Sequence, residues 1–234
     1  MYFPEVCFKG HTPDGSLFLV RKYRPEDRDR VRWICSETGF LGSPQEPFYV
    51  GREEFADVWS GYWTDYEPES AFVAEVNGRV EGYLLGCVDT LRQNRIWKDE
   101  ILPRATRRML RPRWWRHPEN RAFIRANLRS RRRGEFNVPM GVVVDKFPAH
   151  LHINIADPAL RGTGLGKKLM TAYFRYLKAR GVKGVHLGTT SHNRQALPLY
   201  HHLGFQVLIK KRLTMYDHVI EDPPLYFLCM GKKL

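Results

Sequence analysis

Arg161-Gly162-Thr163-Gly164-Leu165-Gly166 is the stretch of this 234-residue sequence that decides the fold. The segment before it, Leu151-His152-Ile153-Asn154-Ile155, alternates apolar and polar residues as a β-strand does. After it, apolar residues recur at helical spacing as far as Leu177, and Gly181 ends the run. A strand, a glycine-rich turn and a helix in this order present free backbone amides at a helix N-terminus, where phosphates bind. The sequence therefore predicts a phosphate-binding loop here.

Two common phosphate-binding motifs do not fit this loop. The dinucleotide motif Gly-x-Gly-x-x-Gly, begun at Gly162, requires a glycine where Lys167 stands. A P-loop requires a glycine where Arg161 stands. The remaining pattern, Arg/Gln-x-x-Gly-x-Gly/Ala, is matched by Arg161, Gly164 and Gly166. This pattern is the pyrophosphate loop of the GNAT N-acetyltransferases, which the stretch resembles.

The resemblance to the GNAT family continues after the loop. Asn193, Tyr200 and Gly204-Phe205 are spaced as in the family's C-terminal motif, in which an Asn opens a helix and a Tyr precedes Gly-Phe. The similarity is dense over 151–208 and looser over 17–88. Within the family, the string Pro148–Ile153 resembles a bacterial subgroup that is similar to the acetyltransferase-like domain attached to O-GlcNAcase.

The other periodic segments complete an α/β (α+β) fold of the GNAT type, a mixed central sheet flanked by helices in one domain, 1–234. Asn77-Gly78, between two apolar runs, favours a type I′ hairpin. Further strands are expected at 17–23, 184–189, 205–209 and 225–230, and further helices after Pro25, over 52–62 and from 193 to 203. Pro198, inside the last of these helices, predicts a bend near Tyr200.

The net charge of +13 is concentrated in one segment. Residues 90–135 hold fourteen arginines and one lysine against four acidic residues, a net +11. We predict a helical insertion at about 90–140 that lies outside the family's common core, with helices over 101–110 and 121–128. Its role stays open between a solvated basic cap, a lid that attracts an acidic acceptor or the phosphates of CoA, and a surface for nucleic acid or anionic membrane. A nucleic-acid partner is disfavoured because no nucleic-acid-binding motif is present.

Composition excludes several other classes of protein. No apolar run approaches the ~18 residues of a membrane span. The first residues lack the pattern of a secretory signal. The four cysteines are scattered, without the spacing of a metal site or of a disulfide framework. We therefore expect a cytoplasmic protein with reduced thiols and no metal, and a homodimer stays open.

The GNAT resemblance implies an acetyl-CoA-dependent N-acetyltransferase in which an acceptor amine attacks the thioester directly in a ternary complex. Acetyl-CoA would lie between the strand 151–155 and the strand 185–189, which splay apart. The residues implied in cofactor binding are Ile153, Asn154, Ile155, Arg161, Gly162, Thr163, Gly164, Leu165, Gly166 and Asn193. Tyr200 would protonate the departing CoA thiolate.

The base that accepts the amine's proton is less clear. His152 is a candidate because an imidazole titrates near neutrality, and Glu81 and Asp145 are alternatives. The sequence does not identify the acceptor. An alternative function is a non-catalytic GNAT-fold module that binds a partner or polyanion through the arginine-rich insertion.

Overall fold

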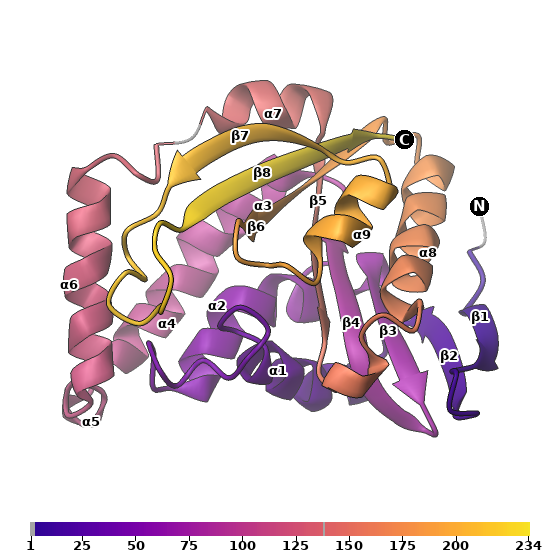
Figure 1. Cartoon of the computed structure of the whole chain (residues 1–234), viewed down its shortest axis with the longest axis horizontal. Coiled ribbons are helices and arrows are strands. Elements are labelled where there is room, and N and C mark those ends of the chain that lie inside the picture. Colours follow the sequence, from indigo (N-terminus) through magenta and orange to yellow (C-terminus); the bar gives the residue numbers. More distant parts are fainter. Residues whose placement is uncertain (1–2, 138) are drawn as a thin grey trace.

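The computed structural model describes residues 3–137 and 139–234, which form a sheet with helices on both faces (Figure 1). The eight strands lie in the order β1-β2-β3-β4-β5-β6-β8-β7, and the pair β5–β6 runs parallel while its neighbours run antiparallel. The strands are β1 (Val6–His11), β2 (Leu17–Lys22), β3 (Ala71–Val76), β4 (Arg79–Cys87), β5 (Ala149–Ile155), β6 (Gly184–Thr190), β7 (Gln206–Arg212) and β8 (Tyr226–Lys233). The mixed sheet confirms the predicted fold class.

Helices connect several of these strands along the chain and pack beside the sheet (Figure 1). They are α1 (Arg28–Glu37), α2 (Arg52–Asp65), α3 (Thr90–Ile96), α4 (Leu102–Met109), α5 (Pro112–Trp115), α6 (Pro118–Arg132), α7 (Met140–Lys146), α8 (Leu165–Ala179) and α9 (Leu197–His202). A π-helical turn, Trp97–Ile101, joins α3 to α4, and a 3₁₀ turn, Pro158–Leu160, lies between β5 and α8. No helix in the described ranges is long and apolar enough to cross a bilayer.

The two faces of the sheet are covered by different helices. Strand alternation sends Leu84 to the core under α8 and Leu85 to the core under α1 and α2. The Tyr173 hydroxyl of α8 lies between the carbonyl oxygens of Cys87 (2.8 Å) and His150 (2.9 Å), on two neighbouring strands, and its one proton is shared between them. A Cβ atom at Gly86 would lie 2.3 Å from the Tyr173 ring, so this strand position requires glycine. Helix α8 is thereby anchored directly over β4 and β5.

The local signals in the sequence produce the expected elements. Asn77 and Gly78 both have positive φ, 47° and 80°, in the hairpin between β3 and β4. Gly181 (φ 71°) and Gly204 (φ 85°) follow the ends of α8 and α9. These predictions are confirmed, because each depends on a backbone conformation that its own residues favour.

Strands β5 and β6 separate soon after they begin. They pair at Ala149–Val185 and His150–His186, and from Leu151 onward β5 has a partner on the β4 side alone. The expected divergence of the two strands is confirmed. It opens a gap at the centre of the sheet, toward the carboxyl ends of both strands.

The insertion between β4 and β5 is built of α3 to α7 and is bound to the rest of the fold (Figure 1). The buried amide of Asn120, on α6, accepts a hydrogen bond from the backbone N–H of Val50 (2.7 Å). Its Nδ2 donates to the carbonyls of Val50 (2.8 Å) and Trp114 (3.0 Å). Trp114 also donates to the Tyr49 hydroxyl at 3.2 Å. The insertion therefore holds the end of the loop that connects α1 to α2.

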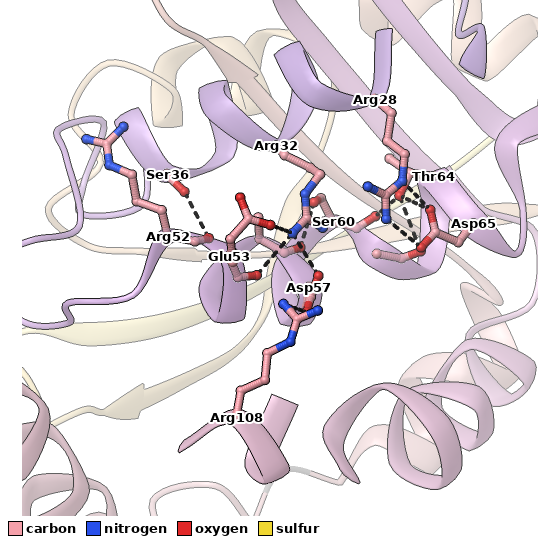
Figure 2. Close-up of polar contacts among 12 residues, drawn as sticks. Arg28, Arg32, Ser36, Arg52, Glu53, Asp57, Ser60, Thr64, Asp65 and Arg108 are labelled. Atoms are coloured by element: carbon pink, nitrogen blue, oxygen red, sulfur yellow. Dashed lines mark hydrogen bonds and ion pairs between the residues drawn. The ribbon is translucent and has the colours of Figure 1, made fainter. Parts of the chain in front are cut away.

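Charged side chains tie a second part of the insertion to α2 (Figure 2). The carboxylate of Asp57 pairs with Arg32 of α1 and with Arg108 of α4, each at 2.8 Å. Arg32 also pairs with Glu53 at 2.6 Å. One carboxylate thus joins two core helices to the insertion, which is not a free arm.

Three expectations at the level of elements need correction. Strand β1 was not expected, because its alternation is weak and it lies at the edge of the sheet. Helix α9 begins at Leu197 rather than at 193. Pro198 therefore occupies the first turn, where its missing N–H has no intrahelical partner to lose, and the proline does not interrupt the helix.

Candidate functional site

The glycine-rich loop has the backbone geometry of an anion site. Gly162 and Gly164 have φ values of 81° and 92°, and Gly164 is the residue that precedes α8. Within residues 3–137 and 139–234, no side chain caps the start of α8, so the amides of its first turn have no side-chain partner there. These amides and the positive end of the helix dipole are available to a phosphate.

The gap between β5 and β6 exposes backbone groups of β5. The N–H of Ala156 donates to Glu81 of β4 at 2.8 Å, so the amides of alternate residues, Asn154 and His152, face β4 as well. The N–H and C=O groups of Ile153 and Ile155 therefore point the other way, into the gap. The Ile155 carbonyl accepts a hydrogen bond from Arg161 at 3.1 Å, so the open strand edge consists of the N–H and C=O of Ile153 and the N–H of Ile155. An extended chain can add to this edge by backbone hydrogen bonds.

A cavity of about 350 Å³ lies where the glycine loop meets this strand edge. The predicted residues that line it are Ile153, Asn154, Ile155, Arg161, Gly162, Gly164, Gly166, Asn193 and Tyr200. Residues from segments 38–42 and 195–199, with Lys167, complete its wall. The structure thus brings together nine of the twelve predicted site residues, and three others, Thr163, Leu165 and His152, do not line the cavity.

The side chains of Thr163 and Leu165 hold the loop in shape. The Thr163 hydroxyl donates to the carbonyl of Leu160 at 2.7 Å and closes the preceding turn. Leu165, the first residue of α8, is 1% exposed, and its side chain packs in the core between α8 and the sheet. Their backbone amides can still take part in anion binding, whereas their side chains cannot.

Arg161 joins three segments that form the cavity. Its guanidinium donates to the carbonyls of Ile155 (3.1 Å) and Ala156 (3.2 Å) at the end of β5. It also reaches the Gly42 carbonyl in the α1–α2 loop (2.9 Å) and Gln195 before α9 (3.2 Å). Arg161 is therefore a brace of the site, a role that the loop motif alone did not indicate.

Comparison with known proteins agrees with this arrangement. The profile of the "Acetyltransferase (GNAT) family" matches residues 42–205, which is more than half of the chain. The chain belongs to the GNAT acetyltransferase family.

Similar structures extend the comparison over nearly all of the GNAT chain. The crystal structure of SsHAT is 32% identical, with a TM-score of 0.68, and the match covers 92% of this chain and 98% of that one. The structure of YncA from Salmonella typhimurium, solved with acetyl-CoA, is 16% identical with a TM-score of 0.52, over 93% of this chain and 94% of that one, and shows likeness of fold. The uncharacterized N-acetyltransferase YjgM of Escherichia coli is 43% identical over 49 residues, which are 21% of this chain and 29% of that protein.

Tyr200 lies at the cavity wall of this GNAT protein, on α9. Its side chain is 4% exposed, and burial raises its pKa above the usual value of 10.0. The phenol is therefore protonated at neutral pH and is available as a hydrogen-bond donor. This state suits a proton donor.

Asn193 lies in the turn between β6 and α9. Its Nδ2 donates to the Thr189 hydroxyl at 3.1 Å, and its Oδ1 accepts the N–H of Ala196 at 3.2 Å. The side chain thus shapes the turn that precedes α9, rather than capping the helix directly. It still contributes to the cavity wall.

His152 lies on the face of β5 opposite α8, beside aromatic rings from α2 and β4. Its ring stacks on Trp63 with a centroid distance of 6.3 Å, and Tyr83 lies 6.0 Å away. Burial lowers the pKa of His152 to about 4, which corrects the expectation that it titrates near neutrality. The Nδ1 atom is buried without a hydrogen-bond partner among the described residues. His152 is therefore neutral at pH 7 and holds an added proton only weakly.

The alternative bases are less favourably placed. The Glu81 carboxylate is committed to Arg30 (2.8 Å) and Arg79 (3.3 Å). Asp145 is exposed on α7, before the start of β5, whereas the cavity lies at the end of that strand. Among the described residues, no group of three or more His, Cys, Asp and Glu side chains is arranged to hold a metal ion.

Proposed function

We propose that this protein transfers an acetyl group from acetyl-CoA to an amine by direct attack in a ternary complex. The observation that carries the proposal is the gap between β5 and β6, where the amides of Ile153 and Ile155 face a cavity that is edged by Gly162 and Gly164. A pantetheine arm is an extended chain with amide groups that match such a strand edge. A diphosphate matches the free amides at the start of α8.

The chemistry follows from the same groups. The amide of Ile153 would polarise the thioester carbonyl and stabilise the oxyanion that forms when the amine attacks. The C–S bond then breaks, and Tyr200 donates its proton to the CoA thiolate. Asn193 would orient the pantetheine arm. His152 remains our candidate to accept the amine's proton, because it is neutral, but its low pKa favours rapid transfer of that proton to water.

Two further proposals concern the assignment of the chain. We infer from the resemblance of the string Pro148–Ile153 that the chain belongs to the bacterial subgroup that is similar to the acetyltransferase-like domain attached to O-GlcNAcase. The whole chain would act as one acetyltransferase domain with a basic insertion. Four unpaired cysteines agree with a reducing compartment such as the cytoplasm.

Ligand-induced stabilisation tests the proposal. A ligand that binds the native state at about 100 times its Kd stabilises the protein by about 2.7 kcal/mol. Acetyl-CoA at millimolar concentration should therefore raise the melting temperature, and adenosine at the same concentration should raise it much less. An unchanged melting temperature would rule out the assigned cofactor site.

A screen of amine acceptors tests the reaction itself. Release of free CoA thiol should require both acetyl-CoA and an amine, and mass spectrometry should find the acetyl group on that amine. If acetyl-CoA stabilises the protein but no class of amine causes release of CoA thiol, the result would favour the alternative, a non-catalytic binding module.

A further inference from the structure

Helix α6 carries a row of arginines on its outer face. Arg121, Arg125, Arg129 and Arg132 are all exposed, and Leu128 lies among them. At 3.6 residues per turn these five positions fall within an arc of about 100° along about 16 Å of helix. The helix lies at the outer edge of the molecule, away from α8 (Figure 1).

The opposite face of α6 is fixed to the protein, so the arginine row is held outward. The Phe123 ring packs on Phe48 and Tyr49, with centroid distances of 5.8 and 5.4 Å. Ala126 is 3% exposed in a cluster with the segment that links β7 to β8. After α6, the Glu135 carboxylate accepts the backbone N–H of Thr214 at 2.8 Å. The helix is therefore a rigid support.

No carboxylate balances the arginine row. None of the four arginines forms an ion pair with an acidic residue in the described part of the chain, whereas Arg108, elsewhere in the insertion, pairs with Asp57. Like charges three and four residues apart on a helix destabilise it. A face that is merely solvated usually mixes both signs of charge. The row therefore favours an external anion.

Exposed apolar side chains accompany the arginines. Leu128, within the row, is 52% exposed. Trp115, 42% exposed, lies next to the first turn of α6, since Arg121 donates to its carbonyl. Phe136, also 42% exposed, follows the last turn. An anionic membrane surface offers phosphates to the arginines and an apolar layer to Leu128, Trp115 and Phe136. The backbone of a nucleic-acid duplex offers phosphates alone, and a single strand offers bases on which aromatic rings stack but no layer for an aliphatic side chain such as Leu128.

We propose that the outer face of α6 docks on an anionic membrane surface. The four guanidinium groups contact lipid phosphates, their aliphatic stems lie along the headgroup region, and Leu128 enters the acyl boundary. This peripheral contact leaves the cavity between β5 and β6 to its own ligands. It is independent of the proposed acetyl transfer.

Vesicle co-sedimentation tests the proposal on the full chain. The protein should bind vesicles of equal parts phosphatidylglycerol and phosphatidylcholine and not vesicles of phosphatidylcholine alone, and salt should weaken the binding. Changing all four arginines to glutamine should weaken it roughly 100- to 1000-fold. A charge-matched control changes Lys9, Lys178, Lys183 and Lys233 to glutamine, which removes the same charge from exposed positions elsewhere. Equal losses in the two variants would overturn the proposal in favour of unspecific net charge.

A second variant separates membrane from nucleic acid. Leu128→Gln should weaken vesicle binding about fivefold through lost apolar burial and leave binding to single-stranded DNA unchanged. Tighter binding to DNA than to vesicles, with no effect of Leu128→Gln, would overturn the membrane assignment. The arginine variant should stay folded and keep its stabilisation by acetyl-CoA, because the row lies on the surface, outside the cavity.

Discussion

Replacement of Asn120 by alanine tests whether the insertion positions the α1–α2 loop beside the cavity. Asn120 has no exposed surface and makes three hydrogen bonds, two to the backbone of Val50 and one to that of Trp114. Each such bond contributes about 1 kcal/mol net, so we expect Asn120→Ala to lower the free energy of unfolding by about 3 kcal/mol. For a chain of this length that loss corresponds to a fall in melting temperature of about 6–12 °C.

The effect should concentrate in the loop between α1 and α2. That loop carries Leu41 and Gly42 to the cavity wall, and Arg161 holds it from the other side. Hydrogen exchange of the backbone near Val50 should accelerate by roughly 100-fold, as expected for a local opening that becomes easier by about 3 kcal/mol. The KM for acetyl-CoA or for the acceptor should rise, because the loop samples more conformations before the ligand binds.

A matched control lies on the same helix. Asn127 is half-buried, and its Oδ1 accepts one hydrogen bond, from the exposed Arg131 at 3.0 Å. Asn127→Ala should change the free energy of unfolding by less than about 0.5 kcal/mol and leave the exchange of the loop unchanged. If the Asn120→Ala and Asn127→Ala variants have the same melting temperature, or if hydrogen exchange near Val50 keeps its wild-type rate, the inference that Asn120 positions the loop is wrong.

Other substitutions examine the cofactor site and the titrating groups. Tyr200→Phe should lower kcat about 100-fold through loss of the proton donor, with little change in acetyl-CoA affinity; steady-state kinetics with unchanged kcat would remove Tyr200 from the chemistry. Gly164→Ala and its control Gly181→Ala should each destabilise the fold by about 1 kcal/mol because both glycines have positive φ, but only Gly164→Ala should raise the KM for acetyl-CoA. The depressed pKa of His152 implies that stability is full above about pH 6.5 and falls as the pH drops toward 4, because the unfolded chain then binds a proton that the folded chain refuses. The resulting loss of unfolding free energy is at most about 3 kcal/mol, and it is smaller if the residue keeps part of its surface exposed to water. Urea unfolding of His152→Gln should therefore depend less on pH than unfolding of the wild type. An identical dependence on pH would contradict the assigned pKa.

The features that could be predicted from sequence are those set by near neighbours. Asn77 and Gly78 form their turn because of the φ values that their own residues adopt. Alternation along β5 correctly separated Ile153 and Ile155 from His152, because side chains on a strand alternate between two faces. The loop Arg161–Gly166 was located by the spacing of its glycines.

Long-range contacts had no comparable signal. The bond from Arg161 to the Gly42 carbonyl spans 119 residues, and the bond between Asn120 and Val50 spans 70. Nothing in the sequence near either partner indicates the other. The pKa of His152 was misjudged for the same reason, since the rings that bury it come from α2 and β4.

One side of the cavity could be predicted from the sequence and the other could not, because the residues that form the second side are far apart along the chain. One side, β5 with the start of α8, is continuous in sequence and belongs to the motif that identifies the family. The other side is the α1–α2 loop, which Asn120 and Trp114 hold from the segment between β4 and β5. Local spacing therefore located the glycine loop, whereas the opposite wall depends on contacts between segments 70 residues apart and had no signal in the sequence.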